Sequence, residues 1–362
     1  MISIFGKEYE KTELLSHVGD MQQIAGVRQV ELVNGNERGV RALEFRTGCG
    51  LDFTLLQDRA MDIYDARFNG APLAWISPVG PVAPSFYEYQ NTGWLRSFPG
   101  GLLTTCGLTQ VGEPAVDNGE ELGLHGRISN IPAKNVAWGA EWDGDDYVIW
   151  ATGEIRETRV FGPNLLLQRS VHARLGEPRI LIKDVIENQG YEDAPIMVLY
   201  HCNIGFPVVC ESTELLAVIN DVQASDDDAE QGLDKFDRFQ LPEAGYKEQV
   251  FFIDHDYDEN GIIKTALVNR SFDNNHGLGI YLSYSQKELP HYTQWKMMGK
   301  GTYVVGMEPG NCIPEGRVNA RERGVLEMLQ PREQKTIHLE IGVLTSNGDI
   351  RAFESMLRGT DG

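Results

Sequence analysis

The sequence predicts an all-β protein, a large antiparallel β-sandwich with few short helices, on three observations. Residues 336–343 carry an apolar side chain at every second position, which places these side chains on one face of a strand. Residues 165–172 and 179–186 are two further apolar runs, and the Gly-Glu-Pro turn at 176–178 between them is typical of a β-hairpin. The 362 residues include 39 glycines and 16 prolines, enough to end many short strands.

Other segments of the chain fit the same fold. Clusters of Gly, Asn, Asp and Pro separate six more short β-rich runs, at residues 41–45, 52–56, 147–151, 195–200, 264–269 and 279–284. Helical patterning is limited to residues 10–18 and 350–357, and the second of these segments follows capping residues at 347–349. Two such segments do not make a helical domain.

We expect a single β-sandwich domain over residues 1–362, with residues 1–40 as an N-terminal extension packed on it. The length alone would also allow two or three domains, but no Pro- or Ser-rich linker and no repeat of fixed period divides the sequence. The acidic residues 225–230 and 234–237 are interpreted as a solvated insertion loop rather than as a domain boundary.

The composition argues against several classes of partner. The chain has 53 Asp and Glu against 32 Lys and Arg, and its formal charge of -21 repels the phosphates of nucleic acids and anionic lipids. No stretch approaches the ~20 apolar residues of a membrane span, and the first residues do not resemble a signal peptide. Five cysteines without a Cys-x-x-Cys pair indicate neither a disulfide framework nor a zinc cluster. We expect a cytoplasmic monomer or homodimer with no nucleic-acid or membrane partner.

Three short motifs contain the residue types of one acid–base site. They are Leu-His-Gly-Arg at 124–127, Tyr-His-Cys-Asn at 200–203 and Met-Glu-Pro-Gly at 307–310. Two imidazoles and one carboxylate can take a proton from one substrate oxygen and give a proton to another near neutral pH. His201 and Glu308 each follow an apolar run and are expected near strand ends, and His125 is expected in a glycine-flanked loop. Such a site requires that the three side chains converge, and the motifs alone do not establish this.

At these residues the chain resembles the aldose 1-epimerase (galactose mutarotase) family, in particular an uncharacterised bacterial branch of it. The resemblance is carried by Leu-His-Gly-Arg, by Tyr-His-x-Asn-x-Gly-Phe-Pro at 200–207 and by Glu-Pro-Gly, in this order, and extends from about residue 41 to 344. The end of the hairpin, residues 185–190, also resembles the family pattern. The resemblance implies the galactose mutarotase-like supersandwich with a concave carbohydrate-binding face, and a small-molecule carbohydrate as partner.

The resemblance also implies a role for each residue of the three motifs. Glu308 matches the general base, His201 the general acid and His125 the histidine that hydrogen-bonds near the sugar ring oxygen. The implied reaction opens the hemiacetal to an aldehyde, which rotates and closes again, and it needs no cofactor and no metal. Because a carboxylate raises the pKa of a nearby imidazole and an imidazolium lowers that of a carboxylate, we expect Glu308 ionised and His201 protonated.

Five residues are candidates for binding the substrate: Arg59, Arg127, Asn203, Trp295 and Lys296. Arg59 has the donor fork that suits a sugar hydroxyl or a carboxylate, although a surface salt bridge explains it equally well. Trp295 could stack on a pyranose or pack in the core. Arg127 and Lys296 would bring positive charge to the cavity and so favour an acidic or phosphorylated sugar. Asp221 is a guess for the carboxylate that orients the substrate.

Two alternatives to an epimerase remain open at the level of the sequence. The chain could be a carbohydrate-binding or sensing protein that keeps the fold without turnover. It could also be a metal-dependent sugar isomerase, because two histidines and Glu308 would suit a divalent transition metal.

Overall fold

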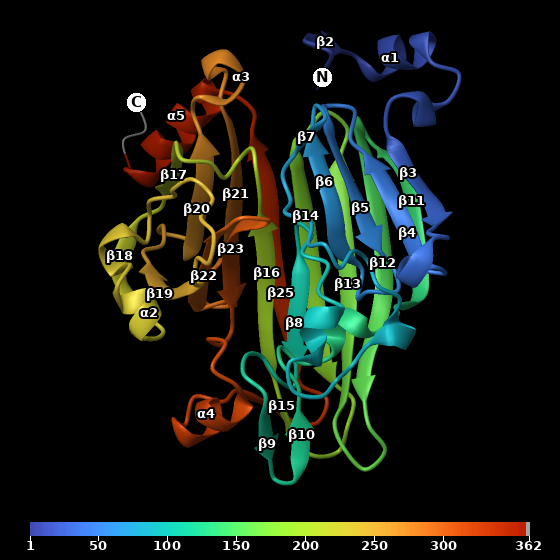
Figure 1. The fold of residues 1–362 in the computed structure, drawn as a ribbon. Helices are drawn as coiled ribbons and strands as arrows, with labels where there is room; N and C mark the ends of the chain where they lie inside the picture. Colours follow the sequence, from blue (N-terminus) through green and yellow to red (C-terminus); the bar gives the residue numbers. More distant parts are fainter. Residues whose placement is uncertain (360–362) are drawn as a thin grey trace.

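The computed structural model describes residues 1–359, and three antiparallel sheets contain most of its strands (Figure 1). The largest sheet has eight strands in the order β11-β12-β13-β14-β25-β21-β20-β17. Their bounds, in that order, are Lys134–Asp143, Asp146–Thr158, Asn164–Arg174, Arg179–Asn188, Gln334–Leu344, Leu278–Ser285, Ile262–Asn269 and Thr213–Leu216. The predicted large antiparallel β-sandwich is therefore confirmed.

The other two sheets have six and five strands. The six-stranded sheet has the order β18 (Ile219–Ala224), β19 (Gln249–His255), β22 (His291–Gly299), β23 (Thr302–Gly310), β16 (Met197–Ile204) and β8 (Thr104–Leu108). The five-stranded sheet has the order β3 (Gly26–Glu31), β4 (Arg41–Arg46), β5 (Leu51–Leu56), β6 (Asp62–Phe68) and β7 (Ala71–Pro72).

Short elements complete the fold. Three two-stranded sheets pair β1 (Ile2–Ile4) with β2 (Lys7–Tyr9), β9 (Ala115–Asp117) with β10 (Glu120–Leu122) and β15 (Ala194–Pro195) with β24 (Met328–Leu329). The α-helices are α1 (Lys11–His17), α2 (Asp227–Glu230), α3 (Phe272–Asn275), α4 (Arg317–Glu322) and α5 (Asn347–Leu357). Single 3-10 turns occur at Met21–Gln23, Gly35–Glu37, Pro84–Phe86, Gly93–Arg96, Ile128–Asn130 and Leu233–Lys235. Within residues 1–359 no helix is long and apolar enough to cross a membrane.

The period-two segments form strands as predicted. The hairpin is β13 and β14, in which Leu165 pairs with Asn188, and residues 336–343 lie within β25. In β25 the side chains of Ile337, Leu339 and Ile341 are buried, because alternate residues of this strand face the core. Both predicted helices are present as α1 and α5, and the Ser346 side chain caps α5 by accepting a hydrogen bond from Asp349 N.

Residues 1–40 fall into two parts. Gly26–Glu31 form β3, the edge strand of the five-stranded sheet, and pair with β4. The preceding β1, β2 and α1 lie above the upper end of the sheets in Figure 1, and their buried Ile2, Ile4 and Leu14 belong to the main hydrophobic core. The expectation that residues 1–40 are an extension on a single domain stays a prediction.

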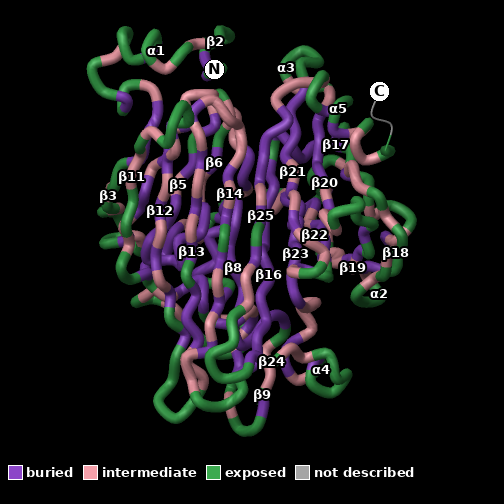
Figure 2. Tube along the Cα trace, turned by 180° about the vertical axis from the view of Figure 1, so that it is seen from behind, coloured by how far each residue is buried: buried purple, intermediate pink, exposed green. Residues whose placement is uncertain are grey.

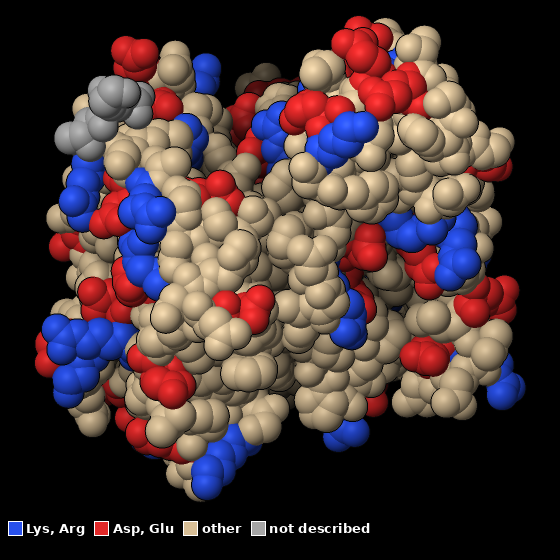
Figure 3. Space-filling model, turned by 90° about the horizontal axis from the view of Figure 1, so that it is seen from above, with Lys and Arg blue, Asp and Glu red and all other residues tan. Residues whose placement is uncertain are grey.

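The buried residues lie along the strands, and the exposed ones along the loops and short helices (Figure 2). All eight residues of β16 are buried, on both faces of the strand. On the outer surface seen from above, acidic and basic side chains are interspersed (Figure 3). This face therefore does not concentrate the negative charge of the chain.

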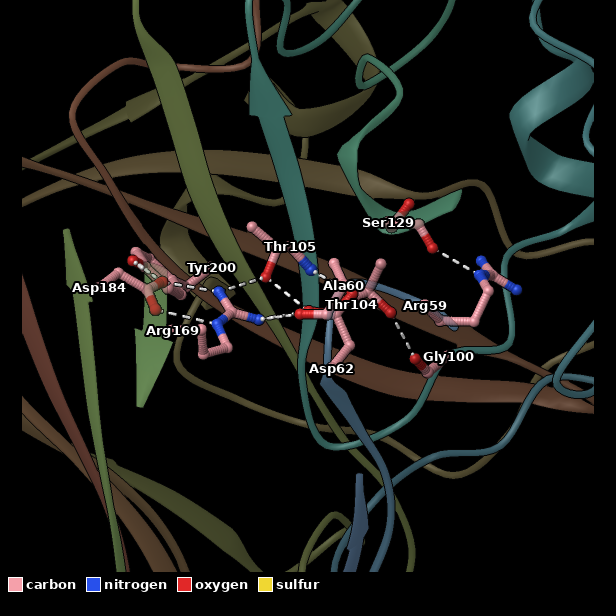
Figure 4. Close-up of polar contacts among 10 residues, drawn as sticks. All are labelled: Arg59, Ala60, Asp62, Gly100, Thr104, Thr105, Ser129, Arg169, Asp184 and Tyr200. Atoms are coloured by element: carbon pink, nitrogen blue, oxygen red, sulfur yellow. Dashed lines mark hydrogen bonds and ion pairs between the residues drawn. The ribbon is translucent and has the colours of Figure 1, made fainter. Parts of the chain in front are cut away.

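A buried ion cluster joins the eight-stranded sheet to β16 (Figure 4). Arg169 on β13 binds Asp184 through two nitrogens, at 2.9 and 2.7 Å, and Asp62 on β6 at 2.8 Å. The Tyr200 hydroxyl donates a hydrogen bond of 2.6 Å to Asp184. Because successive side chains of a strand point to opposite faces, the next residue, His201, points away from this cluster. The cluster thus fixes the orientation of the strand that carries a predicted catalytic residue.

Candidate functional site

His201 and Glu308 lie on neighbouring strands and face each other. Leu199 pairs with Gly310 and Cys202 with Met307, so this antiparallel register places His201 opposite Glu308. Residues opposite each other have their Cβ atoms about 4.5–5.5 Å apart on the same face. His201 Nε2 and Glu308 Oε1 are 3.2 Å apart, and the two residues are 6% and 2% exposed. The strand register therefore explains how two residues 107 positions apart in sequence meet.

Both residues lie near the ends of their strands, as expected, but the strands continue past them. His201 lies inside β16, which continues to Ile204, and Glu308 lies inside β23, which continues to Gly310. Pro309 does not stop the pairing with β22, where it lies opposite Tyr292. Both residues are therefore held by regular sheet, which restrains them more than a loop would.

Gly306 makes room for the Glu308 carboxylate. Residues two apart on a strand share a face, and a Cβ added to Gly306 would lie 2.2 Å from Glu308 Oε1. Any larger residue at this position would push the carboxylate away from His201. The absence of a side chain at 306 is thus part of the geometry of the site.

His125 reaches the same place from a loop. Its backbone has φ 55°, and its N–H donates to Gly112 O while its carbonyl accepts from Gly107 N, each at 3.0 Å. The following Gly126 packs on backbone, since an added Cβ would lie 2.4 Å from two carbonyl oxygens. The imidazole of His125 is 6.0 Å from that of His201, measured between ring centroids. The structure therefore brings His125, His201 and Glu308 together.

The three residues line one cavity of about 680 Å³. This volume lies within the range of about 300–1,000 Å³ found for small-molecule sites. One wall is aromatic and consists of Trp94, Phe98 and Trp295. Their rings contact the histidines, with centroid distances of 4.8 Å from Trp94 to His125, 5.3 Å from Phe98 to His201 and 5.4 Å from Trp295 to His201. The cavity therefore combines an apolar aromatic surface with polar and titratable groups.

Burial shifts the pKa of each member of the site toward its neutral form. It lowers the pKa of His125 to about 4, and together with neighbouring His125 it lowers the pKa of His201 well below the ordinary value. Burial and, second, the charge of Glu248 raise the pKa of Glu308 well above its ordinary value. Burial thus favours the neutral form of both Glu308 and His201, which is opposite to the expected ionised Glu308 beside a protonated His201.

The other sequence-based candidates take different places. Trp295 lines the cavity, and its Nε1 donates a hydrogen bond of 2.8 Å to Glu248. Asn203 is buried two residues beyond His201 and donates to the carbonyls of Gly101 and His201, each at 3.0 Å. It fixes the backbone at His201 rather than lining the cavity.

Three basic candidates lie outside the cavity. Arg59 donates to the carbonyls of Ser129, Val82 and Ser97 at 2.5, 2.9 and 2.8 Å, so its donors connect three loops. Lys296 follows Trp295 on β22 and points to the opposite face, where Nζ donates to Lys235 O at 2.7 Å. Arg127 lines a neighbouring cavity of about 580 Å³, 5.6 Å from the Tyr89 ring. None of these three basic side chains lines the cavity that contains His125, His201 and Glu308.

Several lining residues were not predicted. Trp94 and Phe98 lie in the 3-10 turn and loop at 93–98, where no periodic pattern marks them. Asp226, from the acidic run interpreted as a solvated loop, lines the cavity and caps α2 by accepting from Ala229 N. Asp221, the guess for the substrate carboxylate, is exposed and accepts a hydrogen bond from Gln223.

No set of metal ligands is present in the part of the chain that the structure describes. A group of three or more His, Cys, Asp or Glu side chains placed to hold a metal ion does not occur there. The geometry therefore gives no support to the metal-dependent isomerase considered from the sequence.

Buried histidines should make the protein acid-labile. Burial lowers the pKa of His125 and His255 from 6.5 to about 4, so the unfolded chain binds protons below about pH 6.5 where the folded chain does not. Their contribution to stability is full above pH 6.5 and is lost as the pH falls to about 4, by about 3 kcal/mol for each histidine.

Urea unfolding between pH 7 and pH 4 measures this effect. We expect His255→Gln, which lies outside the cavity, to reduce the pH dependence of the free energy of unfolding, and the exposed His276→Gln to leave it unchanged. If the free energy of unfolding depended on pH equally in the wild type and in His255→Gln, the buried His255 would not contribute to the loss of stability in acid.

The antiparallel sandwich of this chain is the galactose mutarotase-like fold. Within that fold class the chain belongs to the family described as domain of unknown function DUF4432, whose model matches residues 37–343. No match was found among curated proteins.

Solved structures share the fold. A protein from Klebsiella pneumoniae subsp. pneumoniae MGH 78578, described as a putative aldose 1-epimerase, is 26% identical with a TM-score of 0.86, over 93% of this chain and 88% of that one. A galactose mutarotase-like protein from Clostridium acetobutylicum is 13% identical with a TM-score of 0.60, over 89% of this chain and 99% of that one. A galactose 1-epimerase from Lactobacillus acidophilus NCFM is 12% identical with a TM-score of 0.52, over 89% and 99%. The last two likenesses concern the fold alone.

Proposed function

We propose that the protein is a cofactor-independent isomerase of the aldose 1-epimerase type, which interconverts the anomers of an aldose in the cavity that contains His125, His201 and Glu308. The observation that carries the proposal is the 3.2 Å separation of His201 Nε2 and Glu308 Oε1 inside an aromatic-walled cavity. A base and an acid this close can act on two oxygens bonded to the same carbon, which is what the hemiacetal presents.

The reaction moves two protons and breaks one bond. Glu308 takes the proton of the anomeric hydroxyl, His201 gives a proton to the ring oxygen, and the bond between C1 and the ring oxygen breaks to leave an aldehyde. Rotation about C1–C2 exposes the other face of the aldehyde, and the reverse transfers close the ring. We assign the hydrogen bond near the ring oxygen to His125, and the 6.0 Å between its ring and that of His201 supports this role.

The protonation that burial favours suits this order of proton transfers. Burial favours a protonated Glu308 and a neutral His201, the state that ring opening also produces. The reactive state has the same number of protons, with one moved from Glu308 to His201. Sugar hydroxyls that donate to the carboxylate stabilise its ionised form and so promote this transfer.

The direct test is anomer exchange followed by polarimetry or saturation-transfer NMR across a panel of aldoses. We expect the wild type to accelerate exchange of at least one aldose and His201→Asn to abolish the acceleration while the fold is retained. Unchanged rates in the variant would exclude His201 as the acid.

A sugar-binding protein without turnover is the second candidate, and the aromatic wall favours it, because stacking needs no proton transfer. Tight binding of a sugar without any acceleration of exchange would select this candidate.

Trp295 should contribute mainly to binding. We expect Trp295→Ala to raise KM about tenfold, which corresponds to the loss of about 1.4 kcal/mol of contact with a pyranose face. Trp295→Phe should retain part of this contact, and Trp138→Ala, a tryptophan on β11 that does not line the cavity, should leave KM unchanged. Steady-state kinetics of the three variants checks this, and an unaltered KM in Trp295→Ala would place the sugar elsewhere.

A further inference from the structure

The charged side chains that line the cavity are almost all acidic. Carboxylates come from Glu113, Asp226, Glu248, Glu315 and Glu322, and the lining includes a single cation, Arg323. Arg323 is paired with Glu315. Four carboxylates therefore have no basic partner among the residues that line the cavity. On the face seen in Figure 3, by contrast, acidic and basic side chains are interspersed.

Among these carboxylates, Glu248 is the one linked to the proposed catalytic residues, through Trp295 and through its charge. Its Oε2 accepts from Trp295 Nε1 at 2.8 Å, and the Trp295 ring lies 5.4 Å from that of His201. The Oε1 atom of Glu248 takes part in none of the hydrogen bonds of residues 1–359. The charge of Glu248 also raises the pKa of Glu308, so the two carboxylates repel each other.

A buried oxygen of the site, Glu308 Oε1, has His201 Nε2 3.2 Å away but receives no well-directed hydrogen bond within residues 1–359. The Glu308 residue is 2% exposed. The acidic residues thus line a cavity in which a ligand hydroxyl would also supply the missing hydrogen bond to Glu308.

An anionic sugar would meet only one cation here, Arg323, which is already paired with Glu315. Arg127 faces the neighbouring cavity, and Lys296 lies on the opposite face of β22 with its ammonium bound to a carbonyl. A phosphate or carboxylate in the cavity would instead add to the existing repulsion. A neutral sugar would leave the repulsion unchanged, and a cation would relieve it.

We propose that the preferred ligand of this cavity is an amino-substituted aldose whose ammonium group lies beside Glu248. The proposal rests on the proposed function, since it assigns a substrate class to the same site. An ammonium group at Glu248 would cancel the charge that opposes ionisation of Glu308. The substrate would then favour the carboxylate form that takes the anomeric proton.

The test compares D-glucosamine, D-glucose and D-glucose 6-phosphate, with the corresponding galacto sugars, on the wild-type protein. Binding is measured by calorimetry and saturation-transfer NMR, and exchange of the anomers is measured separately. We expect the amino sugar to bind at least about tenfold more tightly than the neutral one, and the phosphate most weakly. The preference should shrink between about 0.01 M and 1 M salt, because ions screen the exposed carboxylates.

Glu248→Gln is the decisive variant. The amide can still accept from Trp295 Nε1, so the expected result is loss of the calorimetric preference for the amino sugar, with little change in the binding affinity for the neutral sugar. Glu121→Gln makes the same charge change in the neighbouring cavity and should leave the preference intact.

The outcomes separate this proposal from the proposed function. Equal or tighter binding of the phosphate, or an amino sugar that binds no better than the neutral one, would overturn the substrate class and leave the epimerase reaction standing. Selective binding of the amino sugar without acceleration of any exchange would overturn the reaction and leave the ligand class. Absence of binding for every sugar would overturn both.

Discussion

Replacing Glu308 by Gln should lower kcat for anomer exchange by about 10²–10⁴, the contribution of a positioned general base. The amide has the shape of the carboxylate, so it can occupy the space that Gly306 leaves open, but it cannot take the anomeric proton. Sugar binding should be retained, because the aromatic wall is unchanged. The effect should therefore fall on kcat and much less on KM.

Stability provides the control for this variant. Burial already favours the protonated, uncharged form of Glu308, so an uncharged amide should leave the free energy of unfolding unchanged or higher. Glu259→Gln, which removes a charge from an exposed turn, should change neither activity nor stability. A folded Glu308→Gln protein with normal exchange would contradict the assigned base.

The largest loss of stability is expected for Arg169→Ala. The Arg169 side chain is fully buried and bonds to Asp184, Asp62, the Ala60 carbonyl and the Thr105 hydroxyl. Its removal leaves two carboxylates in the interior without their cation, which costs about 3–5 kcal/mol. Since Tyr200 shares Asp184 with Arg169, the orientation of β16 and of His201 should suffer as well.

Urea unfolding of Arg169→Ala measures the cost. Arg174→Ala is the matched control, because its guanidinium is partly exposed and lies 3.6 Å from Asp146, an arrangement worth about 1 kcal/mol or less. A loss in Arg169→Ala no larger than that of the control would show that the cluster is not the link between the sheets.

The strands were predictable from periodicity, but their neighbours in the sheets were not. Alternation identifies β25 and the hairpin of β13 and β14 directly. The pairing of β16 with β23 is not encoded in either segment alone, since it depends on which strands the sandwich brings together. The meeting of His201 and Glu308 therefore followed from the family resemblance and not from the pattern.

The alternation of side chains along a strand already limits which residues of the candidate site can face the cavity. Trp295 and Lys296 are adjacent on one strand, so only one of them can face the cavity. The sequence does not indicate which face of β22 lines the cavity, because the strand carries long side chains on both faces. Arg59 was misjudged for a different reason: its donors bind backbone carbonyls, which no side-chain pattern reveals.

The most direct test of the central claim is a crystal structure of the protein with a bound aldose. The account predicts the anomeric oxygen about 2.6–3.2 Å from a Glu308 oxygen and the ring oxygen at a similar distance from a ring nitrogen of His201, with the sugar face against Trp295. A sugar bound elsewhere, for example in the cavity beside Arg127, or oriented with C1 away from Glu308, would contradict it.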